Sequence, residues 1–183
     1  MVVLKLKNVS VSEFEQAFSI MKDSFPEDEY RSYDEQKDLL NNKNYKMYVL
    51  VNTEEEIIAF ICLWIFESFA FIEHFAVKEK YRNHGIGTEI LHKIDELLDC
   101  QICLEVELPE TKMAIRRINF YKRNGYYIND NYDYVQPSYS EDKQPVPLMI
   151  VTSKGTISEM QFEKIKETLY KDVYNVKMKK NYS

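Results

Sequence analysis

The chain has 183 residues, of which 45% are hydrophobic and 14% aromatic, and it contains only four glycines and five prolines. This composition argues against disorder and is sufficient for a substantial hydrophobic core. The formal net charge of −6 argues against a nucleic-acid-binding surface, which is normally basic. No apolar run approaches the ~20 residues that a helix needs to span a bilayer.

The N-terminus and the cysteines indicate where the protein works. Residues 1–7 alternate like a strand and lack the apolar core and cleavage site of a signal peptide. Three cysteines suit a reducing compartment. Cys100 and Cys103 form a C-x-x-C pair, but no second Cys/His pair has the spacing to complete a zinc site. We therefore expect a cytoplasmic protein with no metal, no nucleic-acid partner and no membrane partner.

Hydrophobic periodicity and turn residues predict the elements of the first half. In chain order these are a strand at 1–8, a helix at 11–23 capped by Ser10 or Ser12, a short helix at 32–41, a hairpin of strands at 45–51 and 57–66, and a strand at 69–77. Pro26 separates the first two helices.

The second half alternates helices and strands. An amphipathic helix carrying Ile90, Leu91 and Ile94 comes first. After it we predict a strand at 102–108, a helix at 112–124 ending at Gly125, a strand at 126–135, a loop at 136–145, a strand at 147–152 and a helix from Ser158 to about 175, followed by a fraying tail at 177–183. This order predicts an α/β sandwich in a single domain, residues 1–183, with a C-terminal helical extension at about 157–176.

A loop with glycines at alternate positions separates the strand at 71–77 from the helix that follows. Gly85 and Gly87 open this helix, whose first N–H groups and positive dipole end can hold a phosphate or pyrophosphate. The loop lacks the lysine and Ser/Thr of a P-loop, and it is not a G-x-G-x-x-G fingerprint. It therefore predicts an anion site of another kind.

The stretch Arg82-x-x-Gly85-x-Gly87 resembles the R/Q-x-x-G-x-G/A signature of the GCN5-related N-acetyltransferase (GNAT) family. Three further features arrive in the family's order: Phe75-Ala76-Val77, Leu104-Glu105-Val106 and Phe120-Tyr121-x-x-x-Gly125-Tyr126. The resemblance covers about residues 45–135. It implies a GNAT-like three-layer α/β sandwich, with a mixed, mostly antiparallel twisted sheet flanked by helices and an extra C-terminal helix.

The resemblance also implies acetyl-coenzyme A (acetyl-CoA) as co-substrate. It places the pantetheine arm along the backbone of Phe75, Ala76 and Val77, and the pyrophosphate at Arg82, Asn83, His84, Gly85, Ile86, Gly87 and Thr88. Tyr121 resembles the family's tyrosine, which lies near the coenzyme sulfur and protonates the departing thiolate.

Two carboxylates compete for the role of catalytic base. Glu105 resembles the glutamate of the ribosomal-protein N-terminal acetyltransferase branch, and Glu73 lies on the strand before the loop, where the family also places a glutamate. Glu107 shares the face of Glu105 and could bind a substrate ammonium. Each could instead be solvated or paired with Arg116 or Arg117, and a water could serve as base. His74 is expected on the face opposite Glu73, packed in the sheet.

The resulting prediction is an acetyl-CoA-dependent N-acetyltransferase that transfers directly to a primary amine of a small molecule, peptide or protein. We expect its acceptor pocket among the segment 24–34, the strand 64–75 and the loop 136–145, with surface from aromatic residues such as Trp64 and Phe69. Alternatives are transfer of a longer acyl group, a non-catalytic or sensory acyl-CoA-binding module, and an interaction protein. The sequence leaves the acceptor open, as well as the choice between a monomer and a homodimer.

Overall fold

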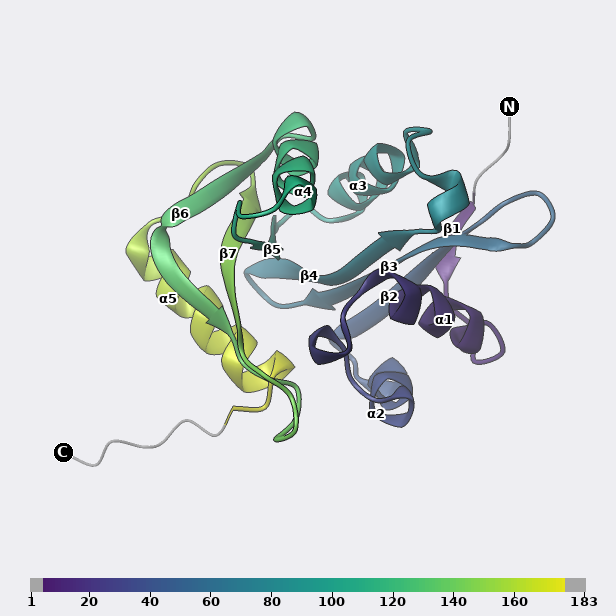
Figure 1. Cartoon of the computed structure of the whole chain (residues 1–183), viewed down its shortest axis with the longest axis horizontal. Helices are drawn as coiled ribbons and strands as arrows, with labels where there is room; N and C mark the ends of the chain where they lie inside the picture. The colour runs from purple at the N-terminus through teal and green to yellow at the C-terminus, as the bar shows by residue number, and fades with distance from the viewer. Residues whose placement is uncertain (1–4, 177–183) are drawn as a thin grey trace. The chain divides into compact units, whose positions relative to one another are not determined.

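The computed structural model describes residues 5–176, and the chain divides into two compact units between Leu104 and Glu105 (Figure 1). Within the described residues, seven strands are hydrogen-bonded in the order β1-β2-β3-β4-β5-β7-β6, and β5 contributes residues to both units. Parallel and antiparallel pairs both occur, so the predicted mixed sheet is confirmed. The single domain over 1–183 stays a prediction.

The first unit contains most of the sheet. Its elements are β1 (Lys5–Asn8), α1 (Phe14–Ser24), α2 (Tyr33–Asp38), β2 (Tyr45–Val51), β3 (Ile57–Ile65), β4 (Phe69–Val77), α3 (Ile86–Leu97) and the start of β5 (Gln101–Glu107), with short 3₁₀ turns η1 (Glu27–Glu29), η2 (Leu39–Asn41) and η3 (Glu79–Tyr81). Each of the strands β1 to β4 pairs antiparallel with the next one along the chain, and β5 pairs parallel with β4. Residues 1–4 of the first predicted strand lie outside the described part.

Helices cover both faces of this unit's sheet. Figure 1 shows α3 on one side of β3 and β4, and α1 with α2 on the other. The middle strand β3 reads IIAFICLWI, and eight of its nine residues are buried. A continuous apolar run is what a strand covered on both faces requires. The predicted three-layer arrangement is therefore confirmed in this unit.

A β-bulge interrupts β4. Cys62 of β3 opposes His74, whereas the next residue, Leu63, opposes Ile72. Glu73 is therefore an inserted residue in β4, because its neighbours Ile72 and His74 oppose consecutive residues of β3. An inserted residue of this kind bends the strand and changes the faces on which the following side chains lie.

The second unit pairs one long hairpin with helices. Its elements are the end of β5, α4 (Lys112–Arg123), β6 (Tyr126–Gln136), β7 (Val146–Ser153), α5 (Glu159–Thr168) and the π-helix η4 (Leu169–Val173). Strands β6 and β7 pair antiparallel, and α4 and α5 both pack on β6. Buried Asn129 accepts from the Ile157 N–H at 2.9 Å and donates to Thr152 Oγ1 at 2.9 Å, which ties α5 to the hairpin.

Local signals placed the helix ends of this unit correctly. Thr111 caps α4 by accepting from the Ala114 N–H at 3.0 Å, and Gly125 follows the helix with φ +81°. Ser158 and Gln161 form a reciprocal capping box at the start of α5. The tail at 177–183 lies outside the described residues. No helix between residues 5 and 176 is long and apolar enough to cross a membrane.

Candidate active site

The glycine loop forms an open cradle at the start of α3. Gly85 is the N-cap residue and has φ +79°, a left-handed conformation that favours glycine. The first intrahelical bond runs from the Glu89 N–H to the Gly85 carbonyl at 3.0 Å. The N–H groups of Ile86, Gly87 and Thr88 precede this bond, so they point out of the helix start and can bind an anion.

Hydrogen bonds from the turn η3 and from Arg82, which follows it, fix the start of the loop. Arg82 Nε donates to the carbonyl of Val77, the last residue of β4, at 2.8 Å. The Tyr81 hydroxyl donates to Glu56 at 2.6 Å. This bond, with those from Lys80 and Lys78, lowers the pKa of Glu56 to about 2. The loop thus starts from a fixed base, while its tip at 82–85 is exposed, including the predicted ligand residue His84.

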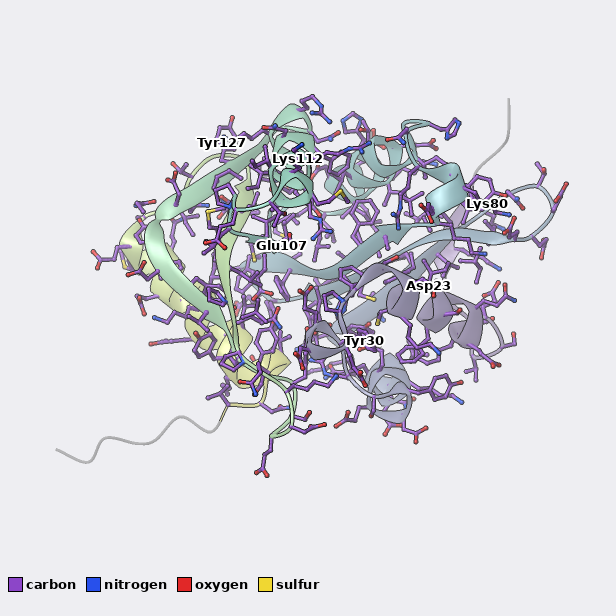
Figure 2. The ribbon with its side chains drawn as sticks, in the orientation of Figure 1. Asp23, Tyr30, Lys80, Glu107, Lys112 and Tyr127 are labelled. Carbon is purple, nitrogen blue, oxygen red and sulfur yellow. The ribbon has the colours of Figure 1, made fainter. Side chains whose placement is uncertain are left out.

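A hollow of about 230 Å³ lies beside the loop's first residue. It lies between the end of α1 and the turn after β4, and Asp23 on α1 and Lys80 on η3 are labelled in Figure 2. Its lining consists of Ile20, Asp23, Ser24, Lys78, Glu79 and Arg82. Both signs of charge line it, so it favours no single class of ligand.

The predicted pantetheine segment forms the end of β4. Phe75, Ala76 and Val77 oppose Ile61, Phe60 and Ala59 of β3. The pairing described between β4 and β5 runs from Phe69↔Gln101 to Ile72↔Leu104. Residues 75–77 therefore come after Ile72, the last residue of β4 for which pairing with β5 is described.

Glu73 lies at the centre of a buried polar cluster. Arg31 Nη1 donates to one carboxylate oxygen at 2.6 Å, and Trp64 Nε1 donates to the other at 2.9 Å. The side chains of Glu73 and Arg31 are 0% and 8% exposed. Burial alone would raise the pKa of Glu73, but the charge of Arg31 and these two hydrogen bonds outweigh it and lower the pKa. Glu73 is therefore held as a carboxylate.

His74 lies on the same side of the sheet as Glu73, so the predicted opposite placement is wrong. Its Nδ1 is 3.9 Å from the Glu73 carboxylate, its Nε2 contacts the Glu29 carbonyl at 2.7 Å, and its ring packs against Phe25. The bulge at Glu73 is the physical reason, because it breaks the alternation on which the prediction relied. Burial lowers the pKa of His74, so the ring is neutral.

In the second unit, Glu105 accepts hydrogen bonds from two tyrosine hydroxyls. Tyr134 on β6 binds one carboxylate oxygen, and Tyr174, just after η4, binds the other at 2.7 Å. Both tyrosines are buried. Sequence reasoning missed both, because they lie 29 and 69 residues from Glu105 and no local pattern connects them.

Glu107 and Tyr121 lie where β5 meets α4. Glu107 pairs with Arg117 of α4, as the salt-bridge alternative predicted. Tyr121 is 7% exposed, and burial raises its pKa to about 12, with Arg117 opposing and Glu107 adding to the shift. Among the described residues no side chain hydrogen-bonds the Tyr121 hydroxyl. The phenol is therefore protonated and able to donate.

Trp64 and Phe69 do not supply the aromatic surface predicted for the acceptor pocket. They are 2% and 4% exposed and belong to the core of the first unit. Tyr30 and Tyr33 pack edge-on against Phe18 of α1, with ring centroids 5.9 and 5.2 Å apart. These aromatic residues therefore contribute to packing within the first unit.

A buried strand running into a glycine loop at a helix start, within a mixed α/β sheet, forms a candidate anion-binding site. The model of the Acetyltransferase (GNAT) family matches residues 13–126, and the chain belongs to this family. The resemblance inferred from the four motifs is thereby confirmed.

Solved structures agree with this assignment. A protein from Bacteroides thetaiotaomicron, placed in the GNAT acetyltransferase family, is 32% identical with a TM-score of 0.86, over 94% of this chain and 99% of the other. The Escherichia coli ribosomal-protein-S18-alanine N-acetyltransferase is 19% identical, with a TM-score of 0.62 over 86% of this chain and 97% of its own.

The Vibrio cholerae spermidine N-acetyltransferase, solved with CoA and spermine, is 12% identical, with a TM-score of 0.61 over 81% of this chain and 94% of its own. At this identity it and the Escherichia coli enzyme show the fold alone. No curated protein sequence matches the chain.

Proposed function

We propose that the protein is an acetyl-CoA-dependent N-acetyltransferase that moves an acetyl group to a primary amine of a small molecule, peptide or protein. The glycine loop carries the proposal, because its helix-start N–H groups fit a pyrophosphate. Family membership supports it, as do relatives of the same fold that act on spermidine and on a ribosomal protein.

The residues of the loop fit the proposed ligand. A Cβ built on Gly85 would meet no atom within 4 Å, so the space in front of the cradle is open. Arg82, Asn83, His84 and the segment 85–88 would hold the pyrophosphate. Phe75, Ala76 and Val77 would bind the pantetheine arm through their backbone, as an added strand does.

Direct transfer needs three proton and bond changes. The neutral amine nitrogen forms a bond to the thioester carbonyl carbon, the C–S bond breaks, and the sulfur leaves as a thiolate. The amine must first lose a proton to become neutral, because with a pKa near ~10 it is mostly protonated at neutral pH, and the nitrogen loses a second proton to the base as the amide forms. The thioester is already activated, so positioning supplies much of the rate.

We assign the thiolate partner to Tyr121, on the strength of the family motif. A phenol with a pKa of about 12 keeps its proton at neutral pH. It is a weaker acid than a thiol, whose pKa is ~8.5, so full proton transfer to the thiolate is uphill. Tyr121 would therefore stabilise the developing thiolate mainly through its hydrogen bond, and solvent would deliver the final proton.

For the base, we propose Glu105 ahead of Glu73. Each Glu105 oxygen accepts a hydrogen bond from a tyrosine hydroxyl, and a carboxylate oxygen can accept more than one such bond, so these tyrosines do not preclude an incoming ammonium. Glu73 lies wholly buried against Arg31 and Trp64. A water remains the third option for proton removal.

The test is titration of acetyl-CoA by calorimetry against the wild type, Gly85→Glu and a control, Gly155→Glu. The control introduces the same side chain at another open glycine with positive φ. We expect Gly85→Glu to abolish binding, because it places a carboxylate in the phosphate cradle, and the control to bind normally. No binding by the wild type would refute the proposal.

Thiol release is then measured with a panel of amines, using acetyl-CoA and longer acyl-CoA donors. Release that depends on both acetyl-CoA and an amine supports the transferase. Faster release with a longer donor would replace acetyl by that acyl group. Binding without release with any pair would favour the sensory acyl-CoA-binding module.

A further inference from the structure

The C-terminal extension packs along β6. Phe162 of α5 stacks on Tyr132 with ring centroids 4.5 Å apart, and its edge meets Tyr134 at 6.4 Å. Further along the extension, the Tyr170 hydroxyl donates to the Val135 carbonyl at 2.6 Å. The extension is thus fixed to the same strand that carries Tyr134, the first partner of Glu105.

The extension ends in a π-helix, which sets the direction of Tyr174. The Tyr174 N–H bonds to the Leu169 carbonyl at 3.0 Å, an i→i+5 bond that widens the last turn. Such widened turns occur often at functional sites. Tyr170 and Tyr174 would share a face of a regular α-helix, yet their hydroxyls bind different partners, the Val135 carbonyl and the Glu105 carboxylate.

Tyr174 connects two parts of the second unit that the sequence linked to catalysis. Its hydroxyl holds Glu105 Oε2 at 2.7 Å, and its ring meets that of Tyr139 at 5.2 Å. Tyr139 belongs to the loop 136–145, which we predicted to line the acceptor pocket. Both contacts come from a side chain that is 6% exposed, so its orientation is fixed by packing.

We infer that Tyr174 is a positioning residue: it holds the Glu105 carboxylate and the loop at Tyr139 in place for the acceptor amine. The inference rests on the proposed transferase function. The match to the family model ends at residue 126, so Tyr134 and Tyr174, which hold Glu105, lie beyond the matched range. The C-terminal extension would thus complete the acceptor side in this chain.

The test compares Tyr174→Phe with the matched control Tyr170→Phe. Each variant removes one hydroxyl from the same end of the chain, but only the first contacts Glu105. We expect Tyr174→Phe to lower kcat about tenfold or more, as loss of a hydrogen bond to a charged group does, with KM for acetyl-CoA changed by less than about twofold. Tyr170→Phe should keep both parameters near wild type.

A double variant separates positioning from simple stabilisation. If Tyr174 acts through Glu105, Tyr174→Phe causes no further loss of kcat in a Glu105→Gln background. Tyr134→Phe, which removes the other donor and leaves the extension intact, should lower kcat similarly and serves as the second variant should Tyr174→Phe fail to fold.

Three results would overturn the inference. The first is an active wild type with an unimpaired Tyr174→Phe variant, and the second is a full additional loss in the Glu105→Gln background. The third is a wild type that binds acetyl-CoA but acetylates no amine, which refutes the proposed function as well. The first two leave that function standing, so the two failures are distinguishable.

Discussion

Replacing Glu73 by glutamine would remove the carboxylate that forms an ion pair with the buried guanidinium of Arg31. The two side chains are 0% and 8% exposed, and their closest atoms are 2.6 Å apart. The introduced amide oxygen could still accept one bond from Arg31, but the amide N–H₂ would face the Trp64 N–H, which is also a donor. Removing one partner of a buried pair costs about 3–5 kcal/mol, and the isosteric change favours the lower end.

We therefore expect E73Q to lower the free energy of unfolding by about 3 kcal/mol. Trp64 is the only tryptophan, and it donates to Glu73, so its fluorescence during urea unfolding reports on this part of the chain. The control is Glu163→Gln, which breaks an exposed i,i+3 pair with Lys166 and should cost less than about 0.5 kcal/mol. A loss below about 1 kcal/mol for E73Q would refute the reasoning.

A double variant tests whether disruption of the Arg31–Glu73 charge pair causes the loss of stability. Arg31→Met in the Glu73→Gln background removes the guanidinium and should recover about 1 kcal/mol or more. The pH dependence has a defined sign, because the folded pKa of Glu73 lies below its ordinary value. The stabilisation is present above the unfolded pKa of ~4.3 and is lost as the pH falls through the folded pKa. E73Q should lack this acid-dependent loss.

Substitutions at four further positions test other parts of the structure. Burial lowers the folded pKa of His74, so below its unfolded pKa of ~6.5 the unfolded chain takes up a proton first. His74→Gln should therefore reduce the fall in urea midpoint between about pH 6.5 and 5, and an unchanged slope would contradict this. Gly85 and Gly125 have φ +79° and +81°, with open space at both Cβ positions. Gly85→Ala and Gly125→Ala should therefore each lower the free energy of unfolding by about 1 kcal/mol, because alanine disfavours this backbone conformation. Calorimetry should show weaker acetyl-CoA binding only for Gly85→Ala. Thr111→Ala should cost about 1 kcal/mol by uncapping α4, a loss that Thr111→Ser should largely avoid in the same urea assay.

Local sequence patterns determined most of the secondary structure. The Ser158 cap forms with a residue three positions away, and Gly125 ends α4 with the positive φ that a C′ glycine supplies. The apolar run at 57–66 predicted the strand that the structure describes as β3. These features depend on residues within about one helical turn or on a short run, so the sequence alone contains the information.

The glycine loop was predictable for a similar reason. Its anion-binding N–H groups come from the backbone at a helix start, and the positions of Gly85 and Gly87 after a buried strand indicate that geometry directly. The order of the four motifs then identified the family that the matching family model supports.

Only the tertiary structure decided which partners surround the candidate bases. Glu73 meets Arg31 from 42 residues away, and Glu105 meets Tyr174 from 69 residues away. The single-residue bulge in β4 put His74 beside Glu73, although strand alternation predicted the opposite faces. Side-chain chemistry at such positions depends on long-range register and packing, which one inserted residue can reverse, so no local pattern encodes it.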